Sequence, residues 1–331
     1  KNEIYNKASL SSNLVKAIAI DHSGYVFIGT ATGGLNIYNP RTNKFKNYQF
    51  PEKKMNYGLS TDDITCLLVT RKNNVLIGTN RGIKQFVRDK ENLKSIPGNN
   101  PHQNPITSLF EDANNKIWVG TRSGIATITE KGTLEQVDFL HETNNIAFNF
   151  PINCFQEDDT HRIWVGTYHQ GLALLDIKNF TYKIFTTKDG LPSNNILGIL
   201  ADGNNLWIST DNGLSKFNMQ TAIFQNLTIE DGLPDNQFNI GSYYKHSKGE
   251  FYFGTYNGLI SFNPAEIAQN ASPPKVVFSD LKLFNIPVRI NDESNLLKND
   301  LNHTNNITFT HDQNVFTIEF VALNIIKSAK N

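Results

Sequence analysis

The chain has 331 residues, a formal net charge of zero from 31 basic and 31 acidic residues, and 39% hydrophobic residues. A balanced charge argues against a nucleic-acid-binding protein, which normally carries a basic surplus, and the hydrophobic fraction argues against a disordered chain. No apolar run approaches the ~20 residues that cross a bilayer. The chain opens at Lys1 without a signal-peptide pattern, so we interpret it as a fragment of a longer protein.

A short apolar run ending in Gly-Thr or Ser-Thr recurs six times along the chain. The copies are VFIGTATGGL from Val26, VLIGTNRGI from Val75, IWVGTRSGI from Ile117, IWVGTYHQGL from Ile163, LWISTDNGL from Leu206 and FYFGTYNGL from Phe251. Their spacing of 42 to 49 residues is typical of four-stranded propeller blades. Each copy also holds four short apolar runs between turn residues, which in the fourth copy are 152–157, 162–166, 172–176 and 182–186. The sequence therefore predicts an all-β propeller over residues 1–263.

Two aligned columns of the repeat have structural interpretations. Trp118, Trp164 and Trp207 share one position with Phe27, Leu76 and Tyr252, and recurrence in every copy favours packing between blades over sugar stacking. A second column is small in every copy, as expected where the innermost strands crowd together; it contains Ala17, Cys66, Ser108, Cys154, Gly198 and Ser242. Cys66 and Cys154 are then two blades apart, beyond the ~7 Å between α-carbons that a disulfide allows, so both are predicted to be free and buried.

The two ends of the repeat region predict how the ring closes. Residues 3–10 align with 184–191, which places Ile4 and Tyr5 in a fourth strand, whereas the sixth copy ends after its third strand. Closure by strand exchange gives six blades and protects the sheet edges; an upstream blade would make seven. Residues 264–275, with Pro273-Pro274, are predicted to be a stiff linker. The alternating pattern around Phe316, Ile318 and Phe320 predicts strands again, so residues 276–331 are interpreted as part of a β-sandwich.

The six copies resemble the two-component-regulator propeller repeat, and the tail resembles the start of the three-tyrosine (YYY) domain that follows it. The residues that carry this resemblance are Gly-Leu-Pro-Ser-Asn at 190–194, Gly-Leu-Pro-Asp-Asn at 232–236, the IWVGT cores at 117 and 163, and Asp-Leu-Lys-Leu-Phe-Asn at 280–285. Asp-Gln-Asn at 312–314 and Phe-Thr-Ile-Glu-Phe at 316–320 belong to the same resemblance. In that family, two seven-bladed propellers precede the sandwich, a membrane helix and a histidine kinase. This chain departs from the pattern in having six copies and a shorter tail.

The resemblance implies a non-catalytic periplasmic sensor region of a hybrid two-component system from gut Bacteroidetes. The implied signal is an oligosaccharide released from a glycan, and the implied output is transcription of polysaccharide-utilisation genes. The implied partners are an upstream propeller and the YYY sandwich of the same chain, a second copy of the receptor as a homodimer, and an inner-membrane anchor, without direct nucleic-acid contact.

The residues themselves favour binding over catalysis. The sequence contains no HEXXH, G-x-S-x-G, Walker loop or paired-cysteine zinc spacing, so we expect no catalytic residue, metal or cofactor. Asp21, Asp112, Asp158 and Asp202 recur at one turn, where an Asx-turn role explains them. Because the scaffold is constant, residues that differ between copies can form a specific site. The turns after each Gly-Thr therefore provide the candidate ligand-binding or interface residues Arg81, Arg122, Tyr168, His169, Asp211 and Tyr256.

Two alternatives stay open at this point. One is a protein-interaction scaffold whose rim binds another protein, with the variable turns packing on another propeller or subunit. A propeller lyase or glycosidase is the other alternative, and it requires carboxylates or a metal cluster at the channel mouth, where Asp211 is the obvious candidate.

Overall fold

The computed structural model describes residues 1–2, 6, 9–49, 63–98, 105–267 and 275–323. The chain divides into two compact units, Lys1–Glu266 and Ile267–Asn331, which are described separately. Within the described residues, no helix has the length and apolar character needed to cross a membrane.

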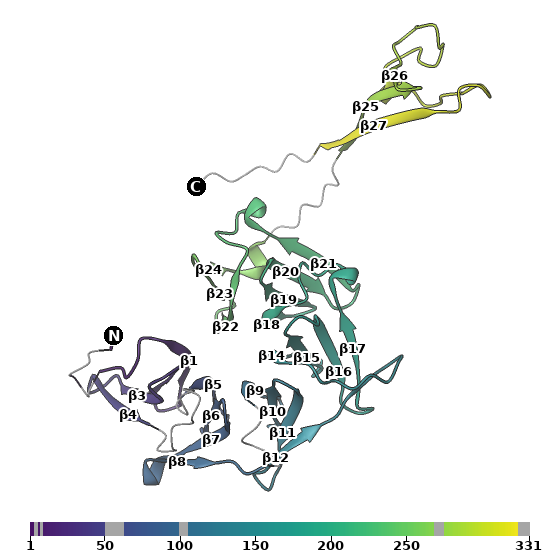
Figure 1. Ribbon diagram of the computed structural model, residues 1–331. Helices are drawn as coiled ribbons and strands as arrows, with labels where there is room; N and C mark the ends of the chain where they lie inside the picture. The colour runs from purple at the N-terminus through teal and green to yellow at the C-terminus, as the bar shows by residue number, and fades with distance from the viewer. Residues whose placement is uncertain (3–5, 7–8, 50–62, 99–104, 268–274, 324–331) are drawn as a thin grey trace, which may run out of the picture. The chain divides into compact units, whose positions relative to one another are not determined.

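The first unit consists of six consecutive sheets, one for each copy of the repeat, whose strand pairs are antiparallel except for one parallel pair in the fourth sheet (Figure 1). The first two sheets contain β1 (Val15–Ile20), β2 (Val26–Thr30), β3 (Leu35–Asn39), β4 (Lys44–Tyr48), β5 (Ile64–Val69), β6 (Val75–Thr79), β7 (Gly82–Val87) and β8 (Asn92–Ser95). The third and fourth contain β9 (Ile106–Glu111), β10 (Ile117–Thr121), β11 (Gly124–Ile128), β12 (Leu134–Val137), β13 (Leu140–His141), β14 (Ile152–Glu157), β15 (Ile163–Thr167), β16 (Leu172–Asp176) and β17 (Thr181–Phe185). The fifth and sixth contain β18 (Ile196–Asp202), β19 (Asn205–Thr210), β20 (Gly213–Asn218), β21 (Ile223–Leu227), β22 (Phe238–Lys245), β23 (Phe251–Thr255) and β24 (Gly258–Phe262).

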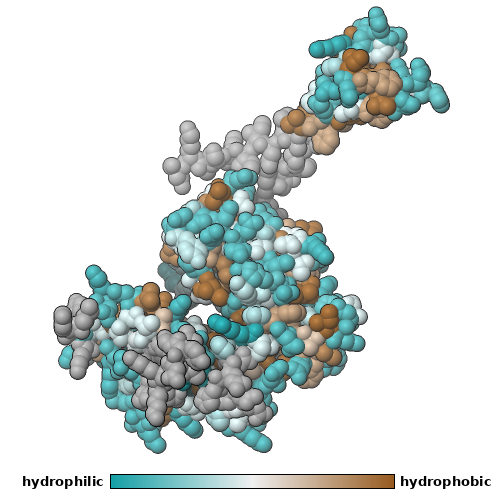
Figure 2. Space-filling model, viewed as in Figure 1, coloured by the Kyte–Doolittle hydropathy of each residue, from teal (hydrophilic) through white to brown (hydrophobic). Residues whose placement is uncertain are grey.

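The fold is a β-propeller, as the sequence predicts. The innermost strands β1, β5, β9, β14, β18 and β22 pack in succession around a common centre (Figure 1). The short 3₁₀ helices η1 (Arg88–Lys90), η2 (Thr187–Asp189), η3 (Ile229–Asp231) and η4 (Pro264–Glu266) lie in the connections between or after strands. In the view of Figure 2, hydrophilic and intermediate residues cover most of this unit and the hydrophobic areas are small.

Each of the first five innermost strands contains an irregularity at the same point. In the fourth blade Ile152 pairs with Thr167 and Cys154 with Gly166, so Asn153 is left out of the ladder as a bulge residue. Its side chain then donates to the carbonyl of Ile196 in the next blade at 2.8 Å. Thr65 makes the equivalent bond to the carbonyl of Ile106 at 2.6 Å. The bulge thus provides a hydrogen bond between neighbouring blades.

The tryptophans of the aromatic column pack between blades, whereas Tyr252 of the sixth blade, at the same position, is partly exposed. Trp118, Trp164 and Trp207 are at most 2% exposed. The indole of Trp118 donates to Asp112 at 2.9 Å, and that of Trp164 donates to Asp158 at 2.8 Å. The other oxygen of each of these aspartates accepts backbone N–H groups of its own turn, which is the Asx-turn role the sequence predicts. Buried indole N–H groups need such an acceptor.

The two cysteines are free. Cys154 is fully buried, Cys66 is partly exposed, and burial raises the pKa of each thiol to about 12.

Because the thiolate is the reactive form, we expect both cysteines to react slowly with a thiol reagent at pH 8, Cys154 more slowly than Cys66. Denatured, non-reduced protein should yield two thiols per chain, and a mass that corresponds to an intramolecular disulfide would contradict this prediction.

The sixth sheet has three strands, as expected from the copy that ends early. Ile4 and Tyr5, predicted as its fourth strand, lie outside the described residues, so closure through them stays a prediction. Successive innermost strands pack closely, but no contact of similar extent joins β1 to β22 in the described part of the chain. Among the described residues, the six sheets therefore form an arc whose first and last innermost strands do not pack together as the others do.

The two ends of this arc expose apolar side chains. Ile18 on β1 is 64% exposed and Leu259 on β24 is 68% exposed. In other blades the same positions are covered by a neighbouring blade. Ile199 corresponds to Ile18, Leu35 corresponds to Leu259, and the side chains of both Ile199 and Leu35 are fully buried. One face of the first blade and one face of the sixth are thus uncovered.

The second unit contains one three-stranded antiparallel sheet among its described residues, in the order β26–β25–β27. These strands are β25 (Lys275–Leu283), β26 (Ile286–Pro287) and β27 (Phe316–Leu323), with η5 (Leu301–His303) between the last two. Leu281, Val288, Leu296 and Leu297 form its small core. Phe316, Ile318 and Phe320 are exposed on one face of β27 and Val321 is exposed on the other, so both faces of this strand carry accessible apolar side chains.

Candidate ligand-binding face

The turns that carry the predicted site residues are built on a buried threonine. In the third blade the hydroxyl of Thr121 donates to the carbonyl of Gly124 at 2.8 Å and accepts the N–H of Ser123 at 3.2 Å. Thr79, Thr167 and Thr210 make the same donation in their blades. The glycine that follows has a positive φ, as in Gly124 (130°), a conformation that other residues rarely adopt. A fixed framework therefore presents a variable pair of residues.

These turns lie on the same face as the Gly-Leu-Pro connections. The N–H of Gly171 donates to the carbonyl of Asn194 at 2.8 Å, and the N–H of Gly213 donates to that of Asn236 at 2.7 Å. Each connection begins with a capping box, in which Thr186 and Asp189 bond reciprocally around η2, and Thr228 and Asp231 do so around η3. Hydrogen bonds thus hold the variable turns against the connections between blades.

The structure places five of the six predicted residues on the surface and Arg81 in a partly buried position. Tyr168 and His169 come together, with ring centroids 3.9 Å apart and His169 at a φ of 63°. Tyr256 is 73% exposed on the sixth blade, held through its backbone N–H by the carbonyl of Gln237 at 3.2 Å.

Asp211 belongs to a polar chain that crosses from the fourth to the fifth blade. Its carboxylate accepts from Asn195 at 3.0 Å, and the side-chain oxygen of Asn195 accepts from Asn153 at 3.3 Å. Both asparagines are 8% exposed, so they anchor an exposed carboxylate from below. Sequence reasoning missed these two residues, although Asn195 directly follows the first Gly-Leu-Pro motif.

Arg122 belongs to a second group, which draws on three blades. Asp63, immediately before β5, accepts from the Asn80 side chain at 2.5 Å. Burial raises the pKa of Asp63, while the Asn80 hydrogen bond and the positive charges of Lys16 and Arg122 oppose that rise. Lys16 is exposed on β1, and Arg122 lies in the turn after β10. Neither Lys16 nor Asp63 stood out in the sequence, because their proximity depends on how blades adjoin.

These two groups give the face a mixture of fixed donors and acceptors. Charged and amide side chains lie at its first to fifth blades, and aromatic rings are exposed at its fourth and sixth. Such a surface suits a hydroxyl-rich or peptide-like ligand better than an apolar one. Within the described residues, no group of three or more metal-ligating side chains is assembled.

Comparison with known proteins identifies the repeat. A model of the two-component regulator propeller matches residues 101–123 and 190–212, which carry the turn of Arg122 and the Asn195–Asp211 pair. These two segments are two-component regulator propeller repeats.

A curated protein is similar to the chain over its whole length. Histidine kinase P4 of Formosa agariphila is 27% identical over 352 residues, covering 100% of this chain and 24% of that protein. The chain thus spans about a quarter of the length of this curated relative.

Two solved structures are similar to the chain at low sequence identity. Virginiamycin B lyase from Staphylococcus aureus has a TM-score of 0.59 at 14% identity, covering 83% of this chain and 92% of that one. The extracellular domain of a protein described as a hybrid two-component system, from B. thetaiotaomicron, has a TM-score of 0.48 at 24% identity, covering 97% and 48%. The lyase confirms the propeller fold of the regulator repeats and carries no argument about activity.

Proposed function

We propose that this chain is a sensory, non-catalytic part of the periplasmic region of a hybrid two-component histidine kinase. In this proposal the variable-turn face detects a glycan-derived oligosaccharide, and the kinase controls transcription of polysaccharide-utilisation genes. The similarity along the entire chain to a quarter of a histidine kinase, together with the regulator propeller repeats, is the observation that carries the proposal.

The geometry of the face supports the sensing role. Arg122, Tyr168 and Asp211 are exposed, but they stand on turns whose backbones are tied to the framework. A ligand that contacts several such turns has little loop entropy to overcome. It can transmit a signal if it binds more tightly to one arrangement of the domains than to another. The second unit, which resembles the start of a YYY domain, is the proposed recipient of that change.

Replacing Arg122 and Tyr168 together with alanine in the intact receptor is expected to abolish signal-dependent transcription. Both side chains are exposed, so the melting temperature of the protein should change little. A reporter gene under the receptor's control and a thermal melt of the purified protein measure the two effects.

A matched control uses an arginine and an aromatic residue from the turns between third and fourth strands. Arg41 and Phe180 are both exposed there, and Phe180 is 51% exposed, close to the 50% of Tyr168. The R41A/F180A receptor should signal normally. Normal signalling by the R122A/Y168A receptor would contradict the proposed site, and loss of signalling with unchanged binding of an oligosaccharide panel would favour docking of a protein.

A further inference from the structure

A cavity of about 510 Å³ lies between the first and second blades, outside the variable-turn face. Strands β2, β3 and β4 form one side of it, and β7 and η1 form the other. Its aromatic walls are Tyr25, Phe27, Phe45, Tyr48 and Phe86, and its polar lining is Asn39, Thr42, Lys44, Lys46, Arg88 and Glu91.

The aromatic rings line the cavity at graded depth. Phe27 is 1% exposed and meets Phe86 edge to face, with centroids 5.6 Å apart. Tyr48 meets Phe86 in the same way at 5.4 Å. Tyr25 is 37% exposed, and Phe45 is partly exposed. The inner end is therefore closed by packed rings, while the outer rings remain accessible to a ligand.

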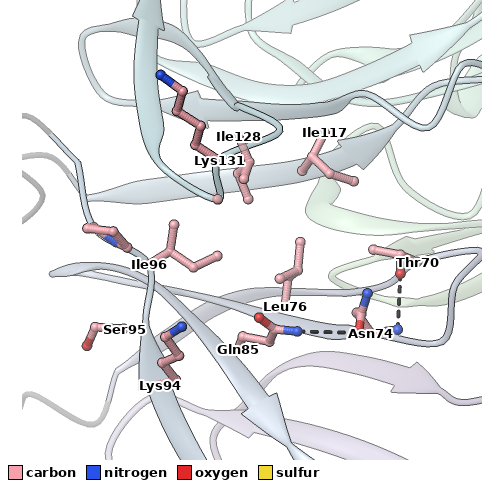
Figure 3. A pocket seen from close by; sticks show the side chains of 12 residues that line it. Thr70, Asn74, Leu76, Gln85, Lys94, Ser95, Ile96, Ile117, Ile128 and Lys131 are labelled. Atoms are coloured by element: carbon pink, nitrogen blue, oxygen red, sulfur yellow. Dashed lines mark hydrogen bonds between the residues drawn. The ribbon is translucent and has the colours of Figure 1, made fainter.

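Two other cavities of the propeller have different linings. Between the second and third blades, the cavity of about 300 Å³ is lined by the aliphatic residues Leu76, Ile96, Ile117 and Ile128 (Figure 3). Lys94 of the second blade and Lys131 of the third line it from opposite sides, and the Lys131 side chain extends away from Lys94 (Figure 3). A third cavity, of about 450 Å³, has Tyr182 as its single aromatic lining residue. Of these three clefts, the first alone has five aromatic rings.

The sequence explains why a cation spans this first cleft. Phe27 occupies the position of Trp118 and Trp164 but has no N–H, so the Asp21 carboxylate has an oxygen available. Arg88 from the second blade donates to that oxygen at 2.6 Å, and its guanidinium lies 5.7 Å from the Phe27 ring centroid. The Arg88 guanidinium also donates to the carbonyl of Asn73 at 3.2 Å. The guanidinium is thus fixed from both blades.

The charges around the cavity are largely paired. Arg88 is matched by Asp21, and Lys46 forms an ion pair with Glu91. Lys44 adds one exposed positive charge. Paired charges offer oriented donors and acceptors without a strong net field, which suits an uncharged ligand with several hydroxyl groups. Flat aromatic walls suit the apolar C–H face of a sugar ring.

We propose that this cleft binds a neutral pyranose sugar. The C–H face of the ring stacks on Tyr25 and Phe45, and the hydroxyl groups bond to Asn39, Lys44 and the Lys46–Glu91 pair. The volume of the cavity admits one or two sugar rings. This site is separate from the variable-turn face, so it stands independently of the function proposed above.

Saturation-transfer NMR on residues 1–331 tests the site with glucose, galactose, mannose, xylose, maltose and cellobiose as probes. At least one probe should give a signal, strongest at its ring C–H protons. Tyr25→Ala and Phe45→Ala should each weaken the affinity for that probe by about tenfold, whereas Tyr25→Phe, which keeps the ring, should retain most of it. Phe180→Ala, at an exposed aromatic residue of the fourth blade, serves as the control and should have no effect.

Four results would overturn the proposal. The first is that none of the six sugars gives a signal, and the second is that the signal is unchanged in both Tyr25→Ala and Phe45→Ala. The third is a clear preference for glucuronate over glucose that Lys44→Ala removes. The fourth is a signal that is lost in R122A/Y168A but kept in the cleft variants. The fourth result would leave the function proposed for the variable-turn face intact. Loss of the signal in the cleft variants alone would support a sugar site in the cleft, and the function of the variable-turn face would then depend on the reporter experiment described above. Circular dichroism and thermal melting of every variant exclude unfolding as the cause.

Discussion

Replacing Ile199 with alanine is expected to lower the free energy of unfolding of residues 1–331 by about 3 kcal/mol. Ile199 is fully buried between the fourth and fifth blades, in the cluster that contains Trp164, Leu172 and Phe217. Removing three of its carbon atoms forfeits their burial and leaves a cavity that β-strands fixed on both sides fill poorly. Urea denaturation followed by tryptophan fluorescence measures the change.

Ile18 offers an internal control, because it is the same residue type at the same position of the repeat. It is 64% exposed, so Ile18→Ala should cost less than about 0.5 kcal/mol in the same span. The difference between the two variants isolates the effect of a neighbouring blade on an otherwise identical site. Equal losses would contradict the exposed state of the first blade's outer face.

Replacing Asp158 with alanine is expected to lower the free energy of unfolding by about 2–3 kcal/mol. One oxygen of this buried carboxylate accepts from the indole of Trp164 at 2.8 Å and from Arg162 at 2.7 Å. The other accepts from the backbone N–H of Thr160 at 2.9 Å. The substitution leaves the indole N–H buried without an acceptor and removes the bonds that hold the turn.

The fifth blade supplies the control for this variant. Its hairpin is one residue shorter, so Asp202 precedes Trp207 by five residues, whereas Asp158 precedes Trp164 by six. The indole N–H of Trp207 is buried and has no hydrogen-bond partner among the described residues. Asp202→Ala should therefore cost less than about 1 kcal/mol, and a loss as large as that of Asp158→Ala would contradict the argument.

The Asp158→Ala variant also has a pH signature. Burial alone would raise the pKa of Asp158, but the hydrogen bonds from Trp164, Thr160 and Arg162 outweigh it and hold the pKa below its usual value. A lowered pKa in the folded state means that Asp158 contributes stability above about pH 4, and that this contribution is lost as the pH falls through the folded-state pKa. The stability curve of Asp158→Ala should accordingly fall less steeply in acid than that of the unchanged chain.

Much of the fold was predictable because the same pattern of apolar runs and turn residues recurs in six copies. Strands β14 and β16 begin and end where the apolar runs of the fourth copy do. The short strand β13 was not predicted. It pairs in parallel with β17, and nothing in the local pattern of Leu140 and His141 reveals a partner forty residues away.

The candidate sites were predictable only in part, for a physical reason. The turns that carry Arg122 and Tyr168 follow directly from the Gly-Thr motif. Contacts between blades bring Asp63, Lys16 and Asn195 to the variable-turn face, and the sequence of a single repeat holds no information about those contacts. The same holds for Arg88, whose partner Asp21 lies 67 residues earlier in the chain.

The uncovered apolar faces of the first and sixth blades have a consequence for the isolated polypeptide in solution. The two faces are different surfaces, at opposite ends of one arc, so a contact between the end of one molecule and the start of another leaves both outer ends unsatisfied. Such head-to-tail contacts do not close after two subunits and can add further molecules. Isolated residues 1–331 should therefore form open-ended assemblies at high concentration. A polar residue in place of Ile18 or Leu259 should stop the growth of these assemblies.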